Sequence, residues 1–301
     1  MRFSIGASIL LGLCLVVRAE ADDQPLTEDL LTLSKHWSVG ANLVYANSES
    51  RNSEAVDFVQ VQTGPAQFVR VPSAVGEQHT VTDLIIYGAS ASYGLTENTE
   101  FSVRASASSS YFRSESAAGT IASNDSRFSD AWLGLSHRFD TGRESASLFG
   151  FAQTAFAENS NVSGTNIVSG KSWLMGVTSY RKVDPMLFSI TAAYQYSMDR
   201  NTDRGVLDPG DVIAIDPSVS FLANPDVTLS LGTSWSSRQG DTRDGGPQSI
   251  RITQMSLNVG VGYAWSENTL LFFNTNADIS GAGGASVSLS FLYQPRHEAD
   301  R

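Results

Sequence analysis

Residues 227–235 read Val-Thr-Leu-Ser-Leu-Gly-Thr-Ser-Trp, and their pattern returns along the whole chain. One set of alternate positions holds Val, Leu, Leu, Thr and Trp, whereas the set between them holds Thr, Ser, Gly and Ser. Successive side chains of a β-strand point to opposite faces of the sheet, so this spacing predicts a strand with one apolar and one polar face. The same alternation is cleanest in residues 285–293.

Twelve such segments follow one another, and the breaks between them alternate in length. The segments begin near residues 37, 82, 100, 128, 146, 171, 186, 212, 227, 250, 269 and 285. Five breaks are tight (96–98, 140–144, 182–185, 223–226 and 265–268), and six are mostly long and polar (47–81, 113–127, 157–170, 198–211, 237–249 and 279–284). Short periplasmic turns and long outer loops are typical of bacterial outer-membrane barrels. We therefore predict an all-β fold, a closed antiparallel transmembrane barrel of twelve strands over residues 36–293.

Aromatic residues on the apolar face give an independent indication of a membrane wall. Rings gather at both interfaces of a lipid-facing barrel. Those beside the tight turns are Trp37, Tyr93, Phe101, Phe139, Phe221 and Tyr263, and those at the opposite strand ends are Tyr45, Tyr111, Tyr196 and Trp235. Two alternatives stay open. A secreted β-sandwich would also alternate, and residues 56–61 with 68–71 could add a hairpin and make fourteen strands, although their poor alternation favours the first outer loop.

The first 35 residues precede the predicted barrel. Residues 1–21 have the basic start, apolar run and small-x-small end of a signal peptide. They include Cys14, the chain's one cysteine, so a disulfide scaffold is excluded. In the following segment, 22–35, the leucines Leu26, Leu30 and Leu33 share one face of a short predicted helix. It could gate the periplasmic mouth or be a loosely ordered terminus. Residues 294–301 form a predicted periplasmic tail, which leaves Phe291 and Tyr293 as an internal signal for the barrel-assembly machinery.

The polar face of each strand would line the barrel, and its residues are small. They include Ser102, Ser106, Ser108, Ser230, Gly232, Ser234, Ser256, Asn258, Gly260, Ser286, Ser288 and Ser290. A barrel of about eight strands is filled by its own side chains, and one of about sixteen strands encloses an aqueous channel. A barrel of twelve strands with this lining of small residues is therefore predicted to have a water-filled lumen. Five charged residues are expected to face inward: Arg104, Asp130, Arg138, Arg238 and Asp278. They would form either a constriction that selects solutes by charge or structural pairs within the wall.

Motifs for catalysis or cofactors are weak. The four histidines do not converge in the predicted topology, and His79 in the first outer loop is expected to be solvated. Residues 164–172 miss the spacing of a phosphate loop by one residue. The acidic loops 208–211 and 241–244 could hold a divalent cation, although solvated surface acids are the favoured interpretation. We expect no enzyme, cofactor or metal site. The net charge of −11 argues against a nucleic-acid partner.

Two segments resemble a known family. Residues 93–101 (Tyr-Gly-Leu-Thr-Glu-Asn-Thr-Glu-Phe) and 129–139 (Ser-Asp-Ala-Trp-Leu-Gly-Leu-Ser-His-Arg-Phe) resemble the strand-turn-strand and Gly-Asp-x-x-Leu-Gly-Leu segments of outer-membrane barrels of the meta-pathway phenol-degradation transporter type. The barrel of functional-amyloid secretion channels is similar. This chain departs from those exporters by lacking their long N-terminal coiled coil, and Ser129 replaces the usual glycine.

The pattern and the resemblance together predict a channel in the bacterial outer membrane. It would pass small solutes through a Ser/Gly-lined lumen, gated by the N-terminal segment, in contact with membrane lipid and lipopolysaccharide. The alternatives are a secretion pore for an extracellular, amyloid-like polypeptide and a non-conducting structural or adhesive barrel.

Overall fold

The computed structural model describes residues 31–48, 58–64, 67–72, 83–116, 119–139, 147–159, 167–202, 205–280 and 284–295. The predicted signal peptide, residues 22–30 of the predicted helical segment and residues 296–301 of the tail lie outside these ranges. The part of the helical segment that is described, residues 31–35, contains an isolated bridge and a turn rather than a helix. No helix of the described residues is long and apolar enough to cross a membrane.

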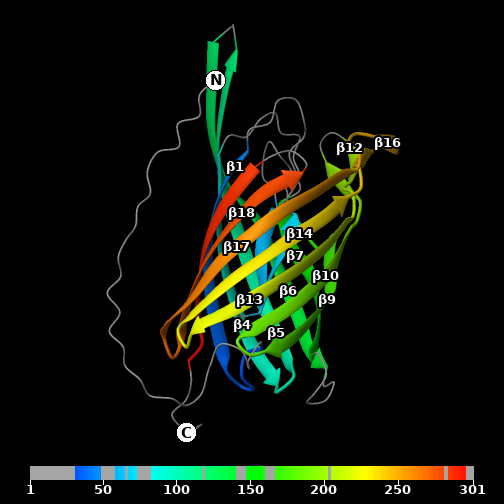
Figure 1. The fold of residues 1–301 in the computed structure, drawn as a ribbon. Coiled ribbons are helices and arrows are strands. Elements are labelled where there is room, and N and C mark those ends of the chain that lie inside the picture. Colours follow the sequence, from blue (N-terminus) through cyan, green and yellow to red (C-terminus); the bar gives the residue numbers. More distant parts are fainter. Residues whose placement is uncertain are drawn as a thin grey trace.

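Twelve antiparallel strands close into a barrel, as predicted (Figure 1). In chain order they are β1 (Trp37–Ser48), β4 (Asp83–Thr96), β5 (Thr99–Ser116), β6 (Gly119–Phe139), β7 (Ser147–Asn159), β9 (Ser172–Val183), β10 (Met186–Ser197), β13 (Val212–Asn224), β14 (Val227–Arg238), β17 (Ile252–Ser266), β18 (Thr269–Ser280) and β19 (Gly284–Tyr293). The first and last strands pair from Val39 with Tyr293 to Ser48 with Gly284, and β6 pairs with β7. Closure leaves this wall without an edge, which hydrocarbon requires.

The alternative of fourteen wall strands is wrong. β2 (Phe58–Gly64) and β3 (Gln67–Pro72) pair only with each other, as a separate two-stranded sheet. The backbone of β3 lies beside β10 and β13, which stand on the opposite side of the ring from β1 and β4. Because the first outer loop connects β1 to β4, this hairpin reaches across the barrel.

The long-loop end also carries structure that the sequence pattern did not predict. The predicted loop 113–127 instead continues β5 and β6 as a hairpin that stands above the barrel (Figure 1). β8 (Ile167–Val168) pairs with the end of β7, and a small outer sheet joins β11 (Arg200–Thr202), β12 (Gly205–Asp208), β15 (Thr242–Arg243) and β16 (Gly246–Pro247). Side chains alternate between lipid and lumen only where a strand crosses the membrane. The hairpin and the outer sheet lie beyond the membrane edge, so their sequences have no apolar periodicity.

The outer wall is apolar and exposed. Large side chains such as Leu43, Leu231 and Leu289 are each more than two-fifths exposed. Aromatic residues stand among them at both ends of the strands, and the rings of Trp37 and Tyr93 lie 4.7 Å apart beside the tight turns. A continuous exposed belt of this kind suits acyl chains rather than water.

Candidate functional site

The inner wall of the barrel is polar and well packed. Ser234, Ser256, Ser288 and Ser290 are all buried, whereas their strand neighbours Leu289 and Phe291 are exposed to the outside. Paired strands put these hydroxyls at matching heights, for example Ser234 opposite Ser256 and Ser189 opposite Ser218. The candidate site is therefore the interior itself, and its shape depends on which parts remain open.

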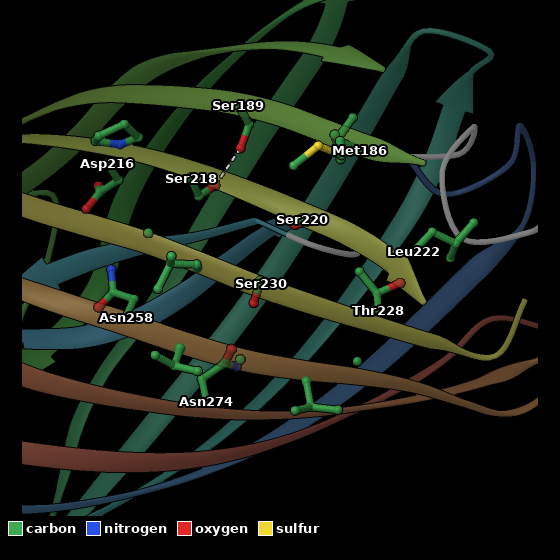
Figure 2. A pocket seen from close by; sticks show the side chains of 18 of the residues that line it. Met186, Ser189, Asp216, Ser218, Ser220, Leu222, Thr228, Ser230, Asn258 and Asn274 are labelled. Carbon is green, nitrogen blue, oxygen red and sulfur yellow. Dashed lines mark hydrogen bonds between the residues drawn. The ribbon is translucent and has the colours of Figure 1, made fainter. Parts of the chain in front are cut away.

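One open region, here called the serine hollow, lies near the tight-turn end between β10, β13, β14, β17 and β18 (Figure 2). Its volume is about 1170 Å³ when open solvent is included. The lining includes Ser189, Ser218, Ser230, Asn258, Asn274 and Phe272. Ser189 and Ser218 are joined by a hydrogen bond of 2.6 Å. Small side chains on these five strands keep the space open.

The opposite half of the same end is occupied by the N-terminal segment, residues 31–36. Leu31 packs in a buried cluster with Trp132, Phe149, Phe151, Ala155, Leu174 and Ala193, which come from β6, β7, β9 and β10. The Thr32 amide donates to Glu100 at 2.7 Å, and the Thr32 and Ser38 hydroxyls are 2.8 Å apart.

The same segment is also fixed through its backbone. The Lys35 amide donates to the Gly94 carbonyl at 2.7 Å, and the Gly94 amide donates to the His36 carbonyl at 3.1 Å. A side chain at Gly94 would collide with the segment, because a Cβ there would lie 2.1 Å from the Leu33 carbonyl oxygen. The segment is thus held inside the mouth by side chains and backbone together.

The predicted gate leucines have different places. Leu26 and Leu30 lie outside the described residues, and Leu33 is 37% exposed. Leu31, which the helical spacing did not select, is 4% exposed. The sequence does hold a signal for its binding surface: β7 carries large apolar residues on both faces, with Phe149 and Phe151 inward and Leu148 and Phe156 on the other parity. A barrel strand that is apolar on both faces must cover something inside.

A second, smaller opening lies toward the long-loop end and is here called the rim hollow. It holds about 460 Å³, and its lining includes Asp130, Trp132, Glu158, Arg200 and Arg238. The charges around it are paired: Arg200 donates from Nε to Glu158 Oε1 at 2.9 Å and from Nη2 to Ser172 Oγ at 2.7 Å. Such pairs fix the outer loops to the rim.

The five predicted lumen charges do not form one ring. Arg104 and Asp130 lie on neighbouring strands, where the Arg104 guanidinium carbon is 4.7 Å from the centre of the Trp132 ring and Ser106 donates to Asp130 at 2.6 Å. Arg238 binds Asp241 at the rim. Arg138 donates to Asn98 in a tight turn, and Asp278 accepts from Gln254 at 2.6 Å. Four of the five have a polar partner in the wall, in a turn or at the rim, and Arg104 keeps two buried nitrogens, Nε and Nη2, without a partner among the described residues.

The histidines and acids show no catalytic grouping in the described part of the chain. His36 Nδ1 is 2.8 Å from the Ser34 carbonyl oxygen, and His137 Nδ1 is 3.0 Å from the Thr99 hydroxyl. His79 and His297 lie outside the described residues. Within the described ranges, no group of three or more His, Cys, Asp or Glu side chains is arranged to hold a metal ion.

Comparison with solved structures supports the barrel fold. A crystal structure of an outer membrane channel from Pseudomonas putida F1 aligns with a TM-score of 0.60 and 11% identity, over 92% of this chain and all of that one. The CymD monoaromatic hydrocarbon channel aligns at a TM-score of 0.45, with 11% identity over 88% of this chain and 90% of its own. The P. putida toluene transporter TodX aligns at 0.44, with 11% identity over 91% and 92%. No protein-family model and no curated protein matches the sequence.

The chain therefore has the outer-membrane β-barrel fold. Its exposed apolar belt and closed backbone are the features that a position in the bacterial outer membrane demands. Its wall is in contact with membrane lipid, and its candidate functional surface is the interior, where the described residues leave the hollows named above.

Proposed function

We propose that the protein is an outer-membrane channel for small solutes, with a path that runs through the serine hollow. The single observation that carries the proposal is the division of the tight-turn mouth. One half is filled by residues 31–36 and the apolar cluster around Leu31, and the other half is the open serine hollow. A barrel that served only as an anchor would have no need for a polar opening beside a docked plug.

The N-terminal segment acts as the gate in this proposal. Its docking depends on one leucine side chain and a few hydrogen bonds, which is weak compared with the strands around it. Segments with few buried contacts open at low free-energy cost. Release would join the space around Phe149 and Phe151 to the serine hollow and widen the path without any change in the wall.

Charge selection in this proposal falls to Arg104 and Asp130. Both lie on the inner wall, Arg104 against Trp132 and Asp130 at the rim hollow, and the guanidinium has two unpartnered nitrogens among the described residues. Charges that line a pore set its ion preference. The other predicted lumen charges, Arg138, Arg238 and Asp278, hold turns and rim in place.

Planar-bilayer recording tests the proposal. The mature protein should give small or rare currents, and a variant lacking residues 22–35 should conduct steadily. The matched control lacks only residues 22–29 and keeps Leu31, Thr32 and Lys35, so it should behave like the mature protein. Silence of both the mature protein and the 22–35 deletion would refute the channel, and steady conduction by the control would refute docking at residues 31–36 as the gate.

A further inference from the structure

Among the amide and hydroxyl atoms in and beside the serine hollow, three have no hydrogen-bond partner in the described residues. They are Asn258 Oδ1 on β17, Asn274 Nδ2 on β18 and Ser288 Oγ on β19. Asn274 is 8% exposed and Ser288 is 3% exposed, so neither is in free contact with bulk solvent. Buried polar groups in native proteins nearly always bind protein, water or a ligand. These three groups therefore call for a polar partner that the described residues do not supply.

The register of the strands places the three groups in one row across β17, β18 and β19, with Asn274 in the middle. Asn274 is directly opposite Ser288 on one side and Gly260 on the other, and Asn258 is two residues from Gly260. Directly paired side chains are about 5 Å apart and diagonal ones about 7 to 8 Å. A Cβ on Gly260 would lie 2.2 Å from Asn274 Oδ1, so the glycine leaves the recess that this amide occupies. Figure 2 shows both amides among the side chains that line the hollow.

We propose that Asn258, Asn274 and Ser288 form a binding subsite for a neutral saccharide; this inference rests on the proposed channel and names its solute class. A hydroxyl both donates and accepts, so a ring bearing several hydroxyls matches an amide oxygen, an amide nitrogen and a serine together. The match also holds if the oxygen and nitrogen atoms of either side-chain amide exchange places. A solute with one hydroxyl satisfies at most part of a trio spread over three strands.

The surroundings fit the two faces of a sugar ring. Phe272, two residues from Asn274 on β18, lines the same hollow and offers an apolar surface for the C–H face of the ring. The ionisable side chains that line the hollow in the described residues are Lys182, Asp184 and Asp216, which come from the turn and from β9 and β13. Neither β17 nor β18 contributes a charged side chain to the lining. The three groups therefore give a charged solute no opposite charge to replace the water that it would lose on binding.

Saturation-transfer NMR on the full chain in detergent micelles tests the subsite without requiring conduction. The probes are D-glucose, cyclohexanol as a ring with one hydroxyl, and D-glucuronate as a charged sugar. Glucose should bind, and both other probes should bind at least about fivefold more weakly, which is the factor of one net hydrogen bond.

The variant Asn258→Leu/Asn274→Leu removes both amides at nearly constant volume and should weaken glucose binding about 25-fold, for two such bonds. The variant Asn258→Ser/Asn274→Ser keeps smaller polar groups, so its affinity for glucose should lie between those of the unmodified chain and the double leucine variant. The control Asn42→Leu makes the same change at an amide on β1 that does not line the hollow, and it should bind glucose as the unmodified chain does.

Equal binding of glucose and cyclohexanol, or unchanged glucose binding by both double variants, would overturn the subsite. The two proposals fail separately. Absence of glucose binding in a chain that conducts after deletion of residues 22–35 removes the subsite and leaves the channel. Glucose binding in a chain that never conducts removes the channel and leaves a saccharide-binding barrel.

Discussion

Replacement of Gly94 by alanine should release the N-terminal segment while leaving that segment's own sequence intact. A Cβ at this position would lie 2.1 Å from the Leu33 carbonyl oxygen and 2.5 Å from the Thr32 carbonyl oxygen. Both are backbone atoms, so no side-chain rotation relieves the collision. The strand can accept alanine only if the segment leaves.

The size of the effect follows from what the segment loses. Burial of a leucine such as Leu31 contributes about 1.5 to 3 kcal/mol, and each net hydrogen bond, such as those from Lys35 and Thr32, about 1 kcal/mol. The docked state therefore loses about 3 to 5 kcal/mol. Since about 1.4 kcal/mol corresponds to a factor of ten, the ratio of open to closed channels should rise by roughly two to three orders of magnitude.

Single-channel recording measures that ratio as the open fraction. The control is Gly40→Ala, in which the new Cβ would meet the Ser90 hydroxyl at 2.6 Å. That hydroxyl is the end of a side chain and can rotate away, so the control should stay mostly closed. A Gly94→Ala channel with the open fraction of the unmodified chain, or a control that opens equally, would show that the docked segment is not the gate.

Three further predictions concern the charges. Arg104→Leu should raise cation over anion permeability about fivefold, the factor of about 1 kcal/mol of charge interaction, as measured by the reversal potential in a salt gradient; an unchanged potential would place Arg104 outside the path. Glu158→Gln leaves the buried charge of Arg200 without its partner, which costs about 3 to 5 kcal/mol, so trypsin should cleave after Arg200 much faster than in the unmodified chain, and an equal rate would contradict a role for this pair in fixing the loop. Burial, and then the neighbouring Asp199, Asp211 and Asp241, raise the pKa of Asp208 in the outer sheet, while Arg200 lowers it. A raised pKa means that the charged form is disfavoured in the folded sheet, so the sheet should be most stable below the ordinary aspartate pKa and lose stability as pH rises through the raised value. Amide exchange of Val206 and Leu207, corrected for intrinsic rates, should therefore be slower in acid, and Asp208→Asn should remove this dependence; a dependence that persists in the variant would refute the assignment.

The sequence predicted the wall of the barrel because lipid imposes a strict alternation on each strand. Leu231 shares the parity of Trp235 and Gly232 has the opposite parity, so alternation along the strand placed them on opposite faces. The extension of β6 back to Gly119 was missed, since that part of the strand stands clear of the wall and has no apolar face to maintain.

The interior was less predictable, because it depends on contacts between residues far apart in the chain. Leu31 docks in the cluster that holds the inward ring of Phe149, and the backbone that follows it passes where Gly94 lacks a side chain; a helical spacing of leucines gives no hint of that geometry. Likewise, the pairing of Arg238 with Asp241 depends on the fold of the outer loop. The sign of a residue's charge can be predicted from the sequence, whereas the residue that it pairs with cannot.

Accessibility at two adjacent residues of β19 tests the central claim most directly. Leu289 is 50% exposed on the outer wall and Ser288 is 3% exposed on the inner wall. The chain's one cysteine, Cys14, lies in the predicted signal peptide, so Leu289→Cys and Ser288→Cys give single spin-label sites in the mature protein. In lipid vesicles, dissolved oxygen concentrates among the acyl chains, so it should enhance the relaxation of the label at 289. The label at 288 should not show this enhancement, which is the lipid signature. Equal access of a water-soluble nickel complex to both labels, or a lipid signature at 288 instead of 289, would contradict a barrel with acyl chains outside and a polar interior.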